Sequence, residues 1–131
     1  MKFKGLSFKD MKDLKGKLEL ISTIDDLDML RDIAKDESDY RIRLKAVERI
    51  DDEEFLKKVA FDDSNRSVMI AAVEGISNQR YLERIANEHS DCHVRVAAIR
   101  RIKDASTLEA ISRNDSNRHV RKIALDMINC Q

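Results

Sequence analysis

The sequence predicts an all-α fold: a right-handed α–α superhelix, or α-solenoid, of about four 26-residue helical hairpins behind one N-terminal capping helix. The chain repeats itself every 26 residues without a gap, and apolar residues inside each repeat follow helical spacing. Proline is absent and glycine occurs only 3 times, which excludes collagen and flexible linkers. One pair of short helices cannot bury its apolar face, whereas stacked pairs can.

Residues 1–24 precede four repeat units, 25–50, 51–76, 77–102 and 103–128, and a short tail follows. Eight columns match in all four units, at positions 6, 9, 10, 14, 15, 18, 22 and 26. Four of them hold one residue type throughout: Leu30, Leu56, Leu82 and Leu108 at position 6, Ser38, Ser64, Ser90 and Ser116 at position 14, Ala46, Ala72, Ala98 and Ala124 at position 22, and Ile50, Ile76, Ile102 and Ile128 at position 26. The length of 131 residues suits a single domain overall.

The N-terminal segment lacks a full unit but continues the register of the repeat. Leu18, Ile21 and Ile24 fall on positions 20, 23 and 26. We therefore expect residues 1–24 to form an N-terminal cap, with one helix over 8–24. Four apolar side chains are expected to cover the open end of the stack: Phe3, Leu6, Phe8 and Met11.

Each unit is expected to form two helices joined by a tight turn. In the first helix, at about positions 3–12, apolar positions 5, 6, 9 and 10 follow helical spacing. Asp26, Asp52 and Asp104 open this helix, where a carboxylate caps free N–H groups. The Ser-Asp or Ser-Asn pair at positions 14–15 caps the second helix, at about positions 16–26. The alanine at position 22 lets neighbouring helices approach closely.

The last unit departs from the others, as terminal units usually do. Its Lys122, Ile123 and Met127 replace the residue types found at those positions elsewhere. The departure predicts a solvent-facing cap and a monomer. The alternative is a self-association end that gives a weak end-to-end dimer, because Ile123, Met127 and Cys130 remain apolar.

Two stretches carry a family resemblance: Cys92–Ile99, which reads Cys-His-Val-Arg-Val-Ala-Ala-Ile, and Asn117–Arg121, which reads Asn-Arg-His-Val-Arg. The repeat pattern resembles HEAT-like repeats, nearest to the short variety in phycobilisome-lyase-type HEAT proteins. The resemblance spans 25–128 and implies the solenoid fold, but it implies little about function. Met69 departs from the Val-Arg step of the family.

Position 19 of the second helix lies in the packed arc and yet holds Arg43, Arg95 and Arg121, with Met69 in the second unit. A buried arginine must be paired or hydrogen-bonded along its fork. We expect an inter-repeat ladder in which the Asp or Asn at position 15 of the same or the next unit is the partner. The alternative is a row of arginines that binds a ligand.

The resemblance implies that the second helices line a concave face, which we take as the candidate protein-binding surface. Small residues occupy its middle and arginines flank them, which suits a helix or an extended segment with apolar anchors and acidic flanks. The candidate residues are Arg41, Lys45, Arg49, Ser67, Ala71, Glu74, His93, Ala97, Arg100, Arg101 and His119. The alternative is a solvated face whose small residues set the curvature.

The charge balance disfavours nucleic acid and a membrane surface as partners, since 25 basic residues match 25 acidic ones. We therefore expect a non-catalytic scaffold or adaptor that binds another protein or a peptide. One alternative is a nucleic-acid binder resembling HEAT-like DNA glycosylases, with a basic half formed by Arg95, Arg100, Arg101, Arg118, Arg121 and Lys122. A further alternative, implied by the resemblance alone, is an accessory subunit for tetrapyrrole attachment.

Catalytic motifs and membrane-length apolar runs are absent from the sequence, so we expect no enzyme and no cofactor. Only two cysteines occur, which favours a reducing, cytoplasmic location. His89, Cys92 and His93 could meet at the turn before a second helix, but the repeat does not build this cluster into other units. We expect no metal there, because a tetrahedral site needs more ligands.

Overall fold

The computed structural model describes residues 2–3, 6–8 and 11–130, with residues 2–3 and 6–7 described by their backbone alone. The described residues form nine α-helices and two strands of two residues each, which confirms the all-α class. The chain divides into two compact parts, Met1–Asp51 and Asp52–Gln131. These two parts are called the first and second unit below, and each 26-residue segment is called a repeat. No helix among the described residues has the length and apolarity to cross a membrane.

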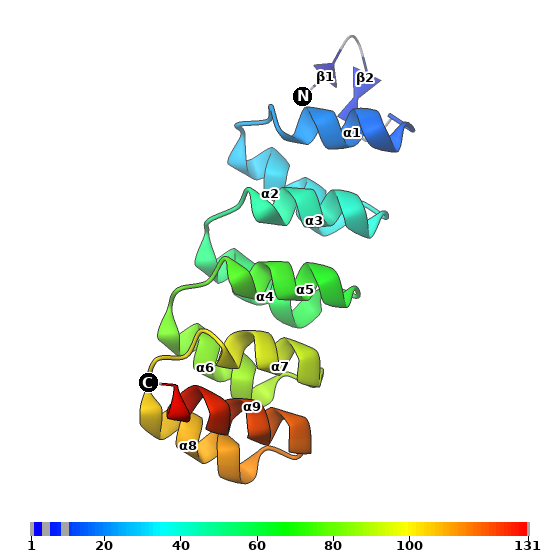
Figure 1. Cartoon of the computed structure of the whole chain (residues 1–131). Coiled ribbons are helices and arrows are strands. Elements are labelled where there is room, and N and C mark those ends of the chain that lie inside the picture. The colour runs from blue at the N-terminus through cyan, green and yellow to red at the C-terminus, as the bar shows by residue number, and fades with distance from the viewer. Residues whose placement is uncertain (1, 4–5, 9–10, 131) are drawn as a thin grey trace. The chain divides into compact units, whose positions relative to one another are not determined.

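The first unit contains a short antiparallel ladder and three helices (Figure 1). Strand β1 (Lys2–Phe3) pairs with β2 (Leu6–Ser7). Helix α1 (Leu14–Ile21) packs on α3 (Tyr40–Glu48), and α2 (Leu27–Asp36) forms a hairpin with α3. The inward-facing side chains of this unit, among them Ile21, Leu30 and Val47, are almost completely buried.

Helix α1 is shorter than the helix expected over 8–24. The carboxylate of Asp13 accepts the backbone N–H groups of Lys15 and Gly16, and this N-cap fixes the helix start at Leu14. Of the four apolar residues expected to cover the end of the stack, Phe8 is buried and Met11 is half-buried. The side chains of Phe3 and Leu6 lie outside the described residues.

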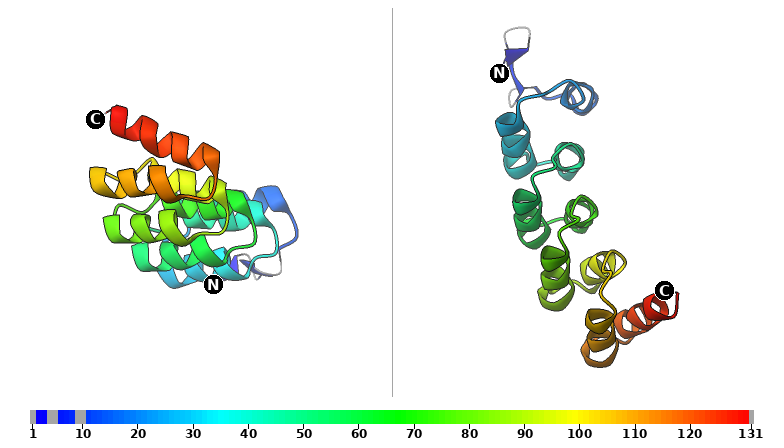
Figure 2. Two further views of the ribbon diagram at one scale, coloured as in Figure 1. Left: turned by 90° about the horizontal axis from the view of Figure 1, so that it is seen from below. Right: turned by 90° about the vertical axis from the view of Figure 1, so that its left-hand side faces the viewer.

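The second unit consists of six helices that pair in chain order as hairpins. The pairs are α4 (Glu53–Asp62) with α5 (Arg66–Glu74), α6 (Gln79–Glu88) with α7 (Cys92–Ile99), and α8 (Ala105–Asn114) with α9 (Arg118–Asn129). Within this unit α5 packs on α7 and α7 on α9, while α4 packs on α6, so the second helices form one layer (Figure 2, right).

The columns of the repeat mark the caps and the core. Position 15 supplies the N-cap of every second helix in the four repeats: Asp39, Asn65, Asp91 and Asn117. The first helices are capped by Asp26, Asp52 and Asp104 as expected, and by Asn78 in the third repeat. The leucines of position 6 and the alanines of position 22 are at most 1% exposed. The predicted burial and capping pattern is therefore confirmed.

Arg95 shows how the buried cation at position 19 is accommodated, and its partner is not the one predicted. Its Nε and Nη2 donate to the Asp115 carboxylate at 3.0 and 3.1 Å, and Nη1 donates to the His89 and Ser90 carbonyls at 2.9 and 3.2 Å. Asp115 is at position 13 of the next repeat, whereas the position-15 residue is already used as the helix cap. The ladder therefore joins position 19 to position 13.

The same spacing recurs at Lys17, whose ammonium lies 2.9 Å from the Glu37 carboxylate, again 20 residues along the chain. Met69 departs from the pattern, and His89 stands where its acidic partner would be. The buried His89 ring instead contacts the Ala60 carbonyl through Nε2 at 2.7 Å and stacks on Phe61 at 5.5 Å. The loss of the cation and the loss of the acid therefore occur together.

Candidate binding groove on the second helices

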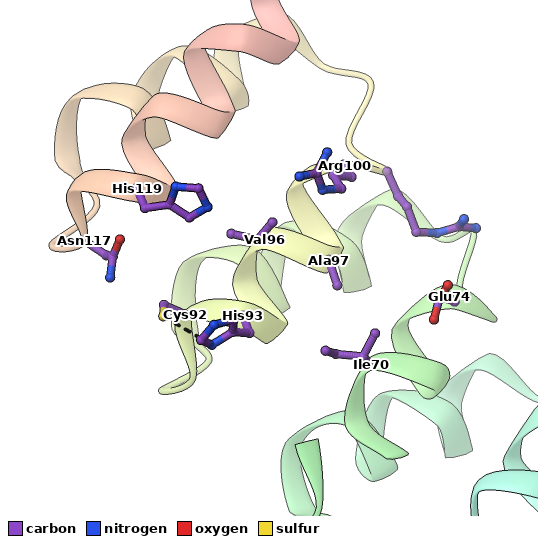
Figure 3. A pocket seen from close by; sticks show the side chains of 10 residues that line it. Ile70, Glu74, Cys92, His93, Val96, Ala97, Arg100, Asn117 and His119 are labelled. Carbon is purple, nitrogen blue, oxygen red and sulfur yellow. Dashed lines mark hydrogen bonds between the residues drawn. The ribbon is translucent and has the colours of Figure 1, made fainter. Parts of the chain in front are cut away.

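The second unit carries a groove of ≈ 600 Å³ on the layer formed by α5, α7 and α9 (Figure 3). Ile70, Val96 and Ala97 form its apolar floor, and all three are half-buried. The rest of its wall is polar and comprises Glu74, Cys92, His93, Arg100, Arg101, Asn117 and His119. The groove is not enclosed, so an elongated segment can enter it.

Six of the predicted surface residues line this groove: Glu74, His93, Ala97, Arg100, Arg101 and His119. Ser67 and Ala71 lie on α5 but do not line it. Four lining residues were not predicted from the sequence: Ile70, Cys92, Val96 and Asn117. Ile70 and Val96 share position 20 of the repeat, where Leu44 is the residue of the first repeat, and this apolar column was the signal that could have found them.

Arg101 lies at the groove but is partly committed to holding the fold. Its Nε and Nη2 donate to the Ile76 carbonyl at 3.1 and 2.9 Å. Arg49, at the same repeat position in the first unit, donates to the carbonyls of Ile21 and Ile24. These arginines add a side-chain donor to carbonyls at or just after the C-terminal end of the preceding helix in the same layer, where few intrahelical donors remain. Arg49 is thus a structural residue.

The other two predicted residues of the first unit also have partners there. Arg41 binds the Asp39 carboxylate with both prongs of its fork, at 3.1 and 2.8 Å. Lys45 lies 4.0 Å from Glu48, one turn away on the same exposed face. A surface pair of this kind contributes little and is easily exchanged, so Lys45 stays accessible to a ligand.

The Asp39–Arg41 pair predicts a pH dependence. The Arg41 guanidinium and its backbone N–H lower the pKa of Asp39 from 3.8 to about 2. Since the folded-state pKa is depressed, the stabilisation is present above pH 3.8 and is lost as the pH falls through about 2. NMR titration of the Asp39 carboxyl is expected to give a midpoint near 2, and Arg41→Gln should raise it toward 3.8. A midpoint near 3.8 in the unaltered chain would contradict the pairing.

Arg100 is the cation that the groove leaves unpaired. It is exposed, and it forms no ion pair with another residue of the described part of the chain. Glu74, on the adjacent wall of the groove, likewise has no ion-pair partner among the described residues. An unpaired guanidinium beside an apolar floor can bind a carboxylate with its planar fork.

His89 does not join the cluster expected from the sequence. Both ring nitrogens are used, because Nε2 contacts the Ala60 carbonyl and Nδ1 accepts the backbone N–H of Asp91 at 3.0 Å. Its place beside Cys92 and His93 is taken by Asp91. The candidate ligand set at this turn is therefore Asp91, Cys92 and His93, all from the start of α7.

No protein-family model, no curated protein and no solved structure matches the chain. The function has to be inferred from the residues that form the groove and the turn beside it.

Proposed function

We propose that the chain is a non-catalytic protein-interaction module that holds a segment of a partner protein against its second helices. In this proposal its hairpins form a cytoplasmic α-solenoid of four 26-residue, HEAT-like units behind an N-terminal cap. The observation that carries the proposal is the groove on α5, α7 and α9, in which an apolar floor adjoins the unpaired Arg100.

The groove favours a partner of definite chemistry. Ile70, Val96 and Ala97 offer an apolar surface, which suits apolar side chains of a partner. Arg100 suits an acidic residue next to those anchors. We therefore expect an extended or helical segment that combines apolar anchors with a carboxylate.

Three of the six cations considered as a nucleic-acid surface are committed to partners within the protein. Arg95 binds Asp115, Arg101 binds the Ile76 carbonyl, and Arg121 donates to the Asp115 carbonyl at 2.7 Å. Lys122 lies 3.1 Å from Asp126 in an exposed surface pair, so it stays accessible like Arg100 and Arg118. A nucleic-acid surface needs free cations to neutralise phosphates, so the engagement of these arginines supports a protein partner over nucleic acid.

The test compares two alanines on neighbouring second helices. Ala97→Glu places a carboxylate on the groove floor, close to where the partner's own acid would bind, and is expected to abolish capture of the partner. Ala71→Glu is the matched control, because Ala71 is equally half-buried but does not line the groove, and it should capture normally. Circular dichroism should show unchanged helix content in both variants.

Capture is measured by affinity purification from the native lysate with mass spectrometry at two salt concentrations, followed by titration with the purified partner. One protein recovered stoichiometrically at both salts by the parent and by Ala71→Glu, but not by Ala97→Glu, is the expected result. Capture that survives Ala97→Glu would rule out the groove. Nucleic acid recovered only at low salt would overturn the assignment of a protein partner.

A further inference from the structure

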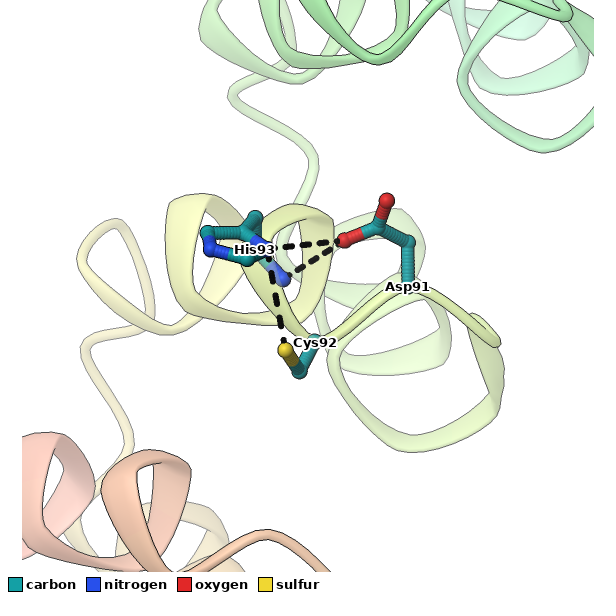
Figure 4. A group of neighbouring side chains, drawn as sticks. All are labelled: Asp91, Cys92 and His93. Atoms are coloured by element: carbon teal, nitrogen blue, oxygen red, sulfur yellow. Dashed lines mark hydrogen bonds and ion pairs between the residues drawn. The ribbon is translucent and has the colours of Figure 1, made fainter.

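Three potential metal ligands meet at the first turn of α7 (Figure 4). One ligand atom each from Asp91, Cys92 and His93 lies within 4.8 Å of the other two. His93 Nδ1 is 3.3 Å from Asp91 Oδ1 and 3.7 Å from Cys92 Sγ. The three side chains converge although they are consecutive in sequence. Asp91 is the N-cap of α7, and its carboxylate is directed toward the first turn, where it accepts the backbone N–H of His93.

Two of the three separations match the edges of a tetrahedral zinc site. Bonds of about 2.3 Å to sulfur and about 2.0–2.2 Å to nitrogen and oxygen place nitrogen about 3.6 Å from sulfur and about 3.4 Å from oxygen. The two observed separations, 3.3 and 3.7 Å, lie within about 0.2 Å of these values. These two edges need little rearrangement to hold an ion, and along the third the carboxylate oxygen and Cys92 Sγ lie within 4.8 Å of each other.

We propose that Cys92 Sγ, His93 Nδ1 and Asp91 Oδ1 form a three-ligand site for a divalent cation that binds thiolate, with Zn²⁺ the expected ion. Sulfur and imidazole nitrogen select zinc-like ions over Mg²⁺ and Ca²⁺, which prefer oxygen. The sequence alone predicts no metal, because a closed tetrahedral site needs four protein ligands; an open site needs three, with water or a group of a partner in the fourth position. The inference does not depend on the proposed function.

Asp91 is held ready for this role by its surroundings. Arg66 Nε donates to Oδ2 at 2.7 Å, and the backbone N–H of His93 donates to Oδ1 at 2.8 Å. Oδ1 keeps a second lone pair for the ion, while Arg66 fixes the orientation of the carboxylate through the other oxygen. Burial opposes its ionisation, but these hydrogen bonds outweigh burial and lower the pKa of Asp91 to about 2, so the ligand is anionic at neutral pH.

The site borders the groove, because Cys92 and His93 also line it (Figure 3). An ion bound there would add positive charge at the opposite end of α7 from Arg100. His119 and Asn117, at the start of α9, line the same groove but are not members of the ligand cluster. His119 is therefore the matched control for His93 in a test of metal binding.

The test is a titration of the reduced full chain with Co²⁺, the spectroscopic probe for zinc sites. We expect one Co²⁺ per chain, a thiolate-to-cobalt charge-transfer band, visible bands of tetrahedral intensity, and displacement of all bands by Zn²⁺. Cys92→Ser should abolish the charge-transfer band, and His93→Ser should weaken Co²⁺ binding by at least about tenfold. Serine is already the residue at the equivalent of His93 in the second repeat, Ser67, so the fold should tolerate it.

Asp91→Asn tests the third ligand without loss of the helix cap, since Asn65 and Asn117 cap the equivalent helices. It should also weaken binding at least about tenfold. Cys130→Ser and His119→Ser are the matched controls and should titrate like the parent. A parent chain without a charge-transfer band, a band lost in Cys130→Ser but kept in Cys92→Ser, or visible bands of octahedral intensity would each overturn the site.

Discussion

Replacing Arg95 with methionine is expected to lower the free energy of unfolding by about 3–5 kcal/mol, the cost of leaving one half of a buried ion pair behind. The Asp115 side chain is only 8% exposed and would lose two charge-assisted hydrogen bonds. The carbonyls of His89 and Ser90 would lose their donor as well. Urea denaturation followed by circular dichroism measures the difference.

The chain contains its own control for this experiment. Met69 occupies the equivalent position without an acidic partner, because His89 stands in place of the acid. Arg95→Met combined with Asp115→His recreates that pairing and should recover a large part of the lost stability. Arg121→Met removes a single hydrogen bond, to the Asp115 carbonyl, and should cost only about 1 kcal/mol. Equal losses in Arg95→Met and Arg121→Met would show that the ion pair adds nothing.

Ala98→Leu is expected to destabilise the second unit by about 1–3 kcal/mol through overpacking. Ala98 is 0% exposed and belongs to the alanine column of position 22, so three added carbon atoms have no free space to enter. Ala97→Leu is the matched control, because the adjacent residue is half-buried and faces the groove. It should leave the melting temperature nearly unchanged.

The melting temperatures of the two leucine variants decide whether position 22 sets the spacing of the helices. A drop in Ala98→Leu alone is the expected result. A melting temperature that is unchanged in Ala98→Leu would mean that the stack relaxes around the larger side chain. The alanine column would then reflect helix propensity rather than close approach.

The sequence was sufficient for the parts of the fold that depend on periodicity. The recurring leucine and alanine columns predicted which faces are buried, and the polar pair at positions 14–15 predicted the N-caps, including Asp91. The start of α1 was predicted wrongly, because the register of Leu18 and Ile21 was extended past Asp13, which caps the helix. A local capping group outweighs a repeat pattern at the end of an element.

The partner of Arg95 could not be predicted from one repeat. Asp91 and Asp115 are both acidic residues near turns. Which of them pairs with Arg95 depends on how one helical hairpin packs on the next. The same limit applies to the groove. Its floor uses Ile70 and Val96, whose column borders the packed arc, so their partial exposure depends on how neighbouring second helices pack.

The position-19 to position-13 ladder has a consequence for how such a chain can grow by gene duplication. Each pair is split between two successive repeats, so a copied repeat must match its own sequence across the new junction. A tandem copy of 103–128 would place Arg121 opposite a second Asp115, whereas a copy of 77–102 would place Arg95 opposite a second His89. Extension by the last repeat is therefore compatible with the ladder, and extension by the third is not. A chain lengthened by a copy of 103–128 would therefore have a matched pair at the new junction, and a chain lengthened by a copy of 77–102 would not.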